Sequence, residues 1–225
     1  MKPPKPVAKR EILEIGHGGL SVPRILWEGD LPKRVSYTGI DLASKKDFER
    51  KLDALGIPKT PDFKTQQRLL AGNKNVDLIT RMRLEFPLRV LEHREEVGKL
   101  RREHGNPNIA FENVDAHKMP EEWTGRFHVV FANNFFNAPD RIDAKTVAGE
   151  IRRVMAPNGL LVTTNPYGED LLDSREREIK AHGGFEKIDP AREKLPLEAR
   201  RFIERMDKAM GGKCPVAVFR KTAAK

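Results

Sequence analysis

Cysteine and long apolar runs are both scarce in this chain. Cys214 is the single cysteine among 225 residues, so no intramolecular disulfide can form and nothing indicates a secreted, disulfide-bonded scaffold. No apolar run approaches the roughly 18 residues that a membrane span needs. The basic N-terminus is not followed by the apolar core of a signal peptide. We therefore expect a cytoplasmic protein with no membrane segment.

Metal-ligand patterns are also missing from the sequence. The six histidines show no metal-ligand spacing on one helix or hairpin, and the lone cysteine adds no second thiolate. We therefore expect no metal site. Separately, we expect His93 to be a surface residue.

The net charge of +9 is concentrated at the two ends of the chain. Residues 1–10 carry four basic side chains and no acid, and residues 213–225 carry four more, again unopposed. Residues 11–212 are left with a net charge of about +1. Basic tails are usually solubilising, so binding of nucleic acid through them is an alternative that we do not favour.

Apolar runs alternate with helix-compatible segments along the chain. Runs at 12–15, 35–41, 109–111, 127–132, 160–162, 185–188 and 215–220 predict strands, and helices are expected at 145–156, near 169–182 and at 197–210. A short helix is also expected from Ser21. Strands that alternate with helices indicate a mainly parallel sheet with helices on both faces.

Three segments fall outside this alternation. Residues 1–10, with three prolines, predict an extended N-terminal arm, and residues 11–225 are expected to form one domain. Residues 43–87 and 190–212 are predicted insertions that decorate one end of the sheet. The first is expected to be helical and to lie before the helix that precedes the third strand.

A glycine-rich turn follows the first predicted strand, in the stretch REILEIGHGGLSVP. It matches the dinucleotide fingerprint G-x-G-x-x-G only in part, because Ser21 stands at the third glycine. Glu14 lies two residues before the first glycine, where its carboxylate would repel a pyrophosphate and attract an ammonium or a sulfonium. The turn therefore favours S-adenosylmethionine over a nicotinamide dinucleotide.

Two further acids follow the next two predicted strands. Asp41 ends the second strand, where a carboxylate can accept hydrogen bonds from both ribose hydroxyls of either cofactor. Asp115 follows the third strand, where an adenine amine would need an acceptor. Carboxyl ends of parallel strands form the ligand-binding edge of α/β sheets, so these acids predict a nucleoside site there.

Five successive segments resemble the motifs of class I S-adenosylmethionine-dependent methyltransferases: EILEIGHGG, YTGIDLAS, FENVDAHKMP, GRFHVVFANNFFN and IRRVMAPNGLLVTT. The resemblance covers about residues 10–44 and 88–165. It implies a Rossmann-like sheet of seven strands, with the last strand antiparallel and inserted beside the fifth, and it implies S-adenosyl-L-methionine as cofactor.

The resemblance also implies roles for individual residues. Glu14, Gly16, His17 and Gly18 would hold the methionyl part of the cofactor, and Asp41 would bind its ribose. Leu42 would pack on the adenine, whose edge Asp115 and Ala116 would read, and Asn133 would lie beneath the sulfonium. His117, close to this pocket, is interpreted as a surface turn residue, with a general base as the alternative.

The acceptor of the methyl group is not encoded in a decisive motif. A nearly neutral body and an insertion able to serve as a lid favour a small-molecule acceptor. The alternative is a protein lysine, because E-E-W at residues 121–123 and the segment FANNFFNAP are similar to non-SET lysine methyltransferases of the disruptor-of-telomeric-silencing family. In that interpretation Asn133 or Asn134 would orient the acceptor amine. A non-catalytic adenosylmethionine-binding or scaffold protein is the alternative of another class, followed by a nicotinamide-dependent oxidoreductase.

Overall fold

The structure is a computed structural model of the chain. It describes residues 9–16, 35–41, 45–60, 62–104, 108–133, 143–164, 176–177, 179–181, 184–209 and 216–222. The helix expected from Ser21 lies outside these residues, as do the sites predicted at His17, Gly18, Leu42 and Asn134.

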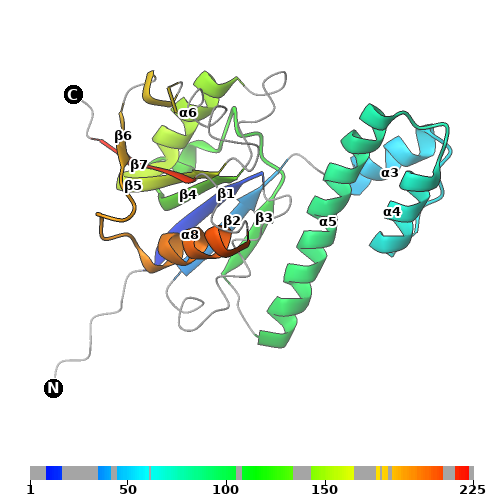
Figure 1. The fold of residues 1–225 in the computed structure, drawn as a ribbon, viewed down its shortest axis with the longest axis horizontal. Coiled ribbons are helices and arrows are strands. Elements are labelled where there is room, and N and C mark those ends of the chain that lie inside the picture. The colour runs from blue at the N-terminus through cyan, green and yellow to red at the C-terminus, as the bar shows by residue number, and fades with distance from the viewer. Residues whose placement is uncertain are drawn as a thin grey trace.

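A seven-stranded sheet with helices packed against it forms the larger part of the molecule (Figure 1), and its strand order is β3-β2-β1-β4-β5-β7-β6. All neighbouring pairs are parallel except those of β7, which runs antiparallel to β5 and β6. The strands are β1 (Arg10–Ile15), β2 (Val35–Ile40), β3 (Ile109–Glu112), β4 (Phe127–Asn133), β5 (Met155–Thr164), β6 (Phe185–Ile188) and β7 (Val216–Lys221). The predicted sheet, with its antiparallel last strand beside the fifth, is confirmed.

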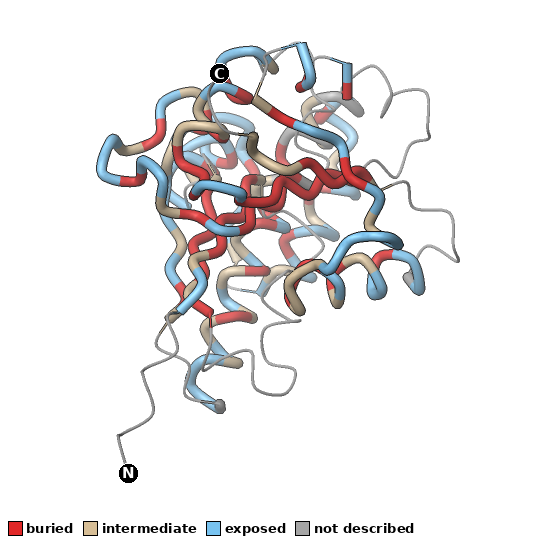
Figure 2. Tube along the Cα trace, turned by 90° about the vertical axis from the view of Figure 1, so that its left-hand side faces the viewer, coloured by how far each residue is buried: buried red, intermediate tan, exposed pale blue. Residues whose placement is uncertain are grey.

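Each face of the sheet has its own apolar core, because successive side chains of a strand point to opposite faces. Leu13 and Ile15 of β1 belong to the core beneath α6 (Ala144–Val154). Ile12 belongs to the other core, which α5 (Leu78–His104) and α8 (Leu197–Ala209) cover. Figure 2 shows the buried residues running through the middle of the strands.

A second structural unit projects from the sheet, the helical arm of residues 45–91 (Figure 1). It comprises α3 (Lys45–Ala54), α4 (Phe63–Gly72) and the first half of α5. Its core is separate from both sheet cores and includes Phe48, Leu52, Leu70, Leu84 and Leu88. The sequence therefore predicted a helical insertion after the second strand correctly.

The boundary of this insertion was predicted wrongly at residue 87. The structure has one continuous helix of 27 residues, α5, that contains Pro87. A proline inside a helix removes one backbone hydrogen bond. Leu84 and Leu88 on either side of it are both buried in the arm core, and this packing keeps the helix unbroken.

Strand β5 begins earlier than the sequence indicates. Pro157-Asn158-Gly159 does not separate a helix from a strand but lies within β5, where Asn158 has a φ of 58°. Phe127 pairs with Met155 and Val129 pairs with Leu160, so β4 advances two residues while β5 advances five. The three extra residues form a bulge at the amino edge of the sheet.

Candidate functional site

The carboxyl ends of β1 and β2 meet at one edge of the sheet, as the motifs require. Glu14 pairs with Gly39 and Ile15 with Ile40. The next residue, Gly16, donates its N–H to the Ile40 carbonyl at 3.0 Å and has a φ of 69°. This left-handed backbone favours glycine, so the turn after β1 begins with the residue type it needs.

Glu14 is buried rather than open to solvent. Its exposed fraction is 1%, and the hydroxyl of Tyr37 donates a hydrogen bond of 2.5 Å to its Oε2. Burial raises the pKa of Tyr37 well above its usual value, and the negative charge of Glu14 raises it further. Tyr37 therefore stays protonated and remains a donor to the carboxylate.

Gly39 gives the Tyr37 hydroxyl its path to Glu14. A Cβ atom at position 39 would lie 2.8 Å from the Tyr37 hydroxyl oxygen and 2.9 Å from Cδ1 of Phe111. Contacts under 3.0 Å are too short for carbon, so no larger residue fits without a shift of these two rings. Glycine at position 39 thus leaves the space that the rings of Tyr37 and Phe111 occupy in the site.

Helix α5 adds a cation to this corner of the sheet. The guanidinium of Arg94 donates to Oδ1 of Asn113 at 3.0 Å, and its Cζ lies 5.9 Å from the centre of the Phe111 ring. Burial lowers the pKa of Arg94, whereas the negative charge of Asp41 opposes that shift. Asp41, which directly follows β2, thus has a positive charge close by.

Phe111 of β3 is enclosed by aromatic rings from two elements. The ring of Tyr37 meets it edge-on at 5.9 Å, and the ring of His93 does so at 6.2 Å. His93 is only 7% exposed, so the expectation that it lies on the surface is wrong. Helix α5 buries this histidine against β3, a tertiary contact that helical periodicity did not indicate.

The segment after β3 is held by Asp115 and His117. The Asp115 carboxylate accepts hydrogen bonds from the His117 backbone N–H at 2.9 Å and from its Nδ1 at 2.7 Å. These bonds hold the pKa of Asp115 below its usual value. Ala116 is buried in the core beneath α6.

The second ring nitrogen of His117 is also engaged. Its Nε2 accepts the backbone N–H of Asp143, the N-cap of α6, at 3.1 Å. An accepting Nε2 places the proton on Nδ1, where it is donated to Asp115. With both nitrogens used, His117 connects the loop to α6 and has no free lone pair for a general base.

The structure describes the position of two residues from the motifs around the fourth strand, Asn133 and Trp123. Asn133 is the last residue of β4, at the same carboxyl edge as Gly16. Trp123 of the 3₁₀ helix η1 (Glu121–Trp123) is 3% exposed, and its ring packs edge-on at 5.3 Å against Phe127. This tryptophan of the E-E-W segment is a core residue.

Sequence reasoning did not single out Tyr37 or Arg94. The period of two in β2 could have indicated that Tyr37, Gly39 and Asp41 share one face. No sequence signal places Arg94 beside them, because that contact depends on how α5 packs over the sheet. Glu14, Gly16, Asp41, Asp115 and Ala116 lie at or beyond the carboxyl ends of β1, β2 and β3, and their contacts with a cofactor stay a prediction.

Among the described residues, no group of three or more His, Cys, Asp or Glu side chains could hold a metal ion. Within the same part of the chain, no helix combines the length and apolar character that crossing a bilayer requires.

Comparison with known proteins gives matches in structure but not in sequence. No protein-family model matches the chain, and no curated protein matches it. The CurJ carbon methyltransferase aligns with 99% of this chain and 50% of its own at 14% identity and a TM-score of 0.50. The CMeT domain of the citrinin polyketide synthase aligns with 99% and 48% at 16% identity and the same score.

A shorter neighbour is the aminoglycoside resistance methyltransferase NpmB1, with 96% of this chain and 89% of its own aligned at 16% identity and a TM-score of 0.49. The chain spans about half the length of the CurJ and citrinin synthase chains. Structural similarity at identities this low indicates the fold and not the reaction. From its strand order and the CurJ and citrinin synthase neighbours, the chain has the fold of the class I S-adenosylmethionine-dependent methyltransferases.

Proposed function

We propose that this protein is an S-adenosylmethionine-dependent methyltransferase that acts on a small-molecule acceptor. The observation that carries the proposal is the buried carboxylate of Glu14 close to Gly16, whose backbone is left-handed, at the carboxyl end of the inner strand β1. A buried negative charge favours a cationic ligand and disfavours a pyrophosphate. At 4–6 Å and an effective dielectric near 20, one such charge pair is worth on the order of 3–4 kcal/mol before desolvation.

The residues present fit an adenosyl ligand. Glu14 and Gly16 would attract and hold the cationic methionyl part, together with His17 and Gly18, which follow in the sequence. Asp41 would accept the ribose hydroxyls, with Leu42 packing on the adenine. Asp115 and Ala116 would meet the adenine edge, and Asn133 would lie near the sulfonium.

The bound cofactor supplies an activated methyl group, and the work of the protein is then positional. In-line transfer requires that the acceptor be held against the methyl carbon and that water be excluded. An acceptor that carries a proton on its nucleophilic atom needs a base. Because His117 has both nitrogens engaged, that base would come from elsewhere in the protein or from the acceptor itself.

Calorimetric titration with S-adenosylmethionine, S-adenosylhomocysteine and NADH tests the proposal. We expect both adenosyl ligands to bind at the carboxyl edge of the sheet and NADH not to bind there. Glu14→Gln should weaken the binding of S-adenosylmethionine at least tenfold, because the lost interaction with its sulfonium is electrostatic. The binding of S-adenosylhomocysteine, whose sulfur is uncharged, should weaken less. Asp207→Asn, at an exposed position on α8, is the matched control and should change neither affinity. Binding of NADH alone would contradict the proposal.

The class of acceptor is tested with a labelled methyl group. The protein is incubated with labelled S-adenosylmethionine and a cell extract that is separated by filtration into small molecules and macromolecules. Label in the small-molecule fraction supports the proposed acceptor, whereas label on protein lysines favours the lysine alternative. Tight cofactor binding without any transfer would indicate a non-catalytic binding protein.

A further inference from the structure

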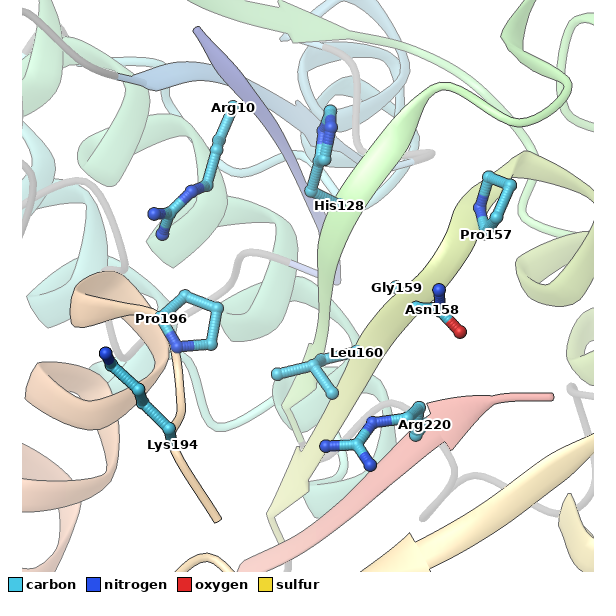
Figure 3. A pocket seen from close by; sticks show the side chains of 9 residues that line it. All are labelled: Arg10, His128, Pro157, Asn158, Gly159, Leu160, Lys194, Pro196 and Arg220. Atoms are coloured by element: carbon cyan, nitrogen blue, oxygen red, sulfur yellow. The ribbon is translucent and has the colours of Figure 1, made fainter. Parts of the chain in front are cut away.

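A pocket lies at the amino edge of the sheet, opposite the edge that carries Glu14 and Asp41. It has a volume of about 320 Å³ and is lined by residues from β1, β4, β5, β7 and the segment before α8 (Figure 3). Strand β1 has six residues, which at about 3.3 Å each separate the two edges by roughly 20 Å. A ligand in this pocket cannot touch a group bound at the carboxyl edge.

The bulge of β5 creates one wall of the pocket. Pro157, Asn158 and Gly159 all line it, and they are the residues that β5 inserts between its pairings with Phe127 and Val129. A Cβ atom on Gly159 would lie 2.9 Å from the Ala156 carbonyl oxygen. A side chain at position 159 would therefore clash with the backbone of this wall, so the bulge requires glycine there.

Three cationic side chains line this space: Arg10 of β1, Arg220 of β7 and Lys194 of the segment before α8 (Figure 3). Arg10 donates from one terminal nitrogen to both carboxylate oxygens of Glu198 at 2.9 and 3.0 Å. Arg220 donates to Glu193 at 2.9 Å. These pairs fix both guanidinium groups and leave further N–H donors on each.

Lys194 and His128 complete the set of donors. Lys194 is exposed and makes no hydrogen bond or ion pair with the residues that the structure describes. The Nδ1 of His128 accepts the backbone N–H of Glu11 at 3.2 Å, so the proton of the neutral ring lies on Nε2. Three cations against two glutamates leave the pocket with an excess of positive charge.

We propose that this pocket binds the phosphate group of a small molecule at a site separate from the carboxyl edge. Guanidinium groups held in place by acids match the geometry of phosphate oxygens, and an ammonium adds a point charge. The pocket is too far from the carboxyl edge to hold an acceptor, so its ligand acts as an effector or an anchor. The proposal does not depend on the methyltransferase assignment.

Calorimetric titration of the full chain with inorganic pyrophosphate at low salt tests this site. We expect saturable binding, weakened at least fivefold in Lys194→Ala and in Arg220→Gln. Lys194→Ala is the more decisive variant. The Lys194 side chain makes no hydrogen bond or ion pair in the described structure, so its loss should not affect folding. Lys208→Ala, which removes one exposed charge from α8 outside the pocket, should change the affinity less than twofold.

Three results would overturn the proposal. They are an absence of saturable binding to the unmodified chain, equal weakening by Lys194→Ala and Lys208→Ala, and binding of citrate as strong as that of pyrophosphate. A parallel titration with S-adenosylmethionine keeps the two assignments apart, since Lys194→Ala should leave that affinity unchanged. A chain that binds pyrophosphate but no adenosyl ligand would support the pocket and contradict the proposed function.

Discussion

At the scale of single residues, the pair of Tyr37 and Glu14 is the most consequential contact near the proposed cofactor site. Both side chains are almost fully buried, and the hydroxyl donates directly to the carboxylate. A hydrogen bond to a buried charged group is worth more than one between neutral groups, because an unsatisfied buried charge is strongly destabilising. Tyr37 therefore stabilises the charge on which the proposed cofactor preference rests.

Replacing Tyr37 by Phe should lower the free energy of unfolding by about 1.5–3 kcal/mol, because Glu14 loses its donor. Urea denaturation measures this change. The same substitution in a Glu14→Gln background should cost clearly less, since the buried charge is gone. Equal losses in both backgrounds would show that the two side chains are not coupled.

Two glycines form a matched pair for a second experiment. Gly39→Ala should destabilise the protein by about 1–3 kcal/mol, because the added methyl group meets Tyr37 and Phe111 at under 3.0 Å. Gly149→Ala, on α6 with nothing within 4 Å, should stabilise it by about 0.5–1 kcal/mol. Thermal denaturation should shift the two melting temperatures in opposite directions. A neutral Gly39→Ala would mean that the two rings move aside freely.

At the scale of elements, α6 holds the segment between β3 and β4 through Glu150 and Arg153. Oε2 of Glu150 accepts the backbone N–H of Met119 at 2.7 Å, and the Arg153 guanidinium donates to Glu150, to the Met119 carbonyl and to Thr124. These bonds hold the pKa of Glu150 below its usual value, with Arg153 as the main cause. The loop that carries Asp115 is thus connected to α6 at both of its ends.

This anchor predicts a pH dependence of stability. Since the pKa of Glu150 is lower in the folded protein, its contribution is present above the unfolded value and is lost as the pH falls through the folded one. Unfolding followed from about pH 5 to pH 3 should show a shallower loss of stability in Glu150→Gln than in the unmodified chain. Glu204→Gln on α8 is the control, and its slope should match that of the unmodified protein. An unchanged slope in Glu150→Gln would contradict the anchor.

The elements themselves could largely be predicted from the sequence. Apolar runs identified β4 and β6 to within a residue, because buried parallel and edge strands are short and clearly bounded. The prediction was wrong where tertiary packing overrides a local signal. Pro87 did not end a helix, and Asn158-Gly159 formed a bulge rather than a turn. For the site, strand-end acids could be found by position, whereas the neighbours that Arg94 meets depend on the packing of α5.

At the scale of the whole molecule, charge and packing both divide the chain into two parts. The helical arm has its own core, and residues 45–91 carry eleven Lys and Arg against six Asp and Glu. The near-neutral charge of residues 11–212 is therefore an average over a basic arm and a more acidic sheet domain. The arm projects away from the sheet, and its predicted role as an acceptor lid stays a hypothesis.

Because the arm core is separate from the sheet cores, we expect the arm to unfold locally while the sheet stays folded. Leu70→Ala, at a fully buried position in the arm core, should cost about 2–5 kcal/mol locally and raise amide hydrogen exchange in α3 and α4. Exchange in β1, β4 and β5 should remain at its original rate. Leu161→Ala, in the sheet core, is the matched control and should raise exchange across the sheet. Faster exchange in β4 of Leu70→Ala would show that the two cores unfold together.

Helix α5 has a mechanical consequence, because it contributes to the arm core and to the sheet core that α8 also covers. Beyond Pro87 it runs without interruption to His104, a length of about 25 Å at 1.5 Å per residue. Val97 fixes this helix to the sheet and Leu88 to the arm. A tilt of about 10° at the sheet end would carry the far end through roughly 4 Å. A small adjustment around Arg94 would therefore produce a larger displacement at the arm end of this helix.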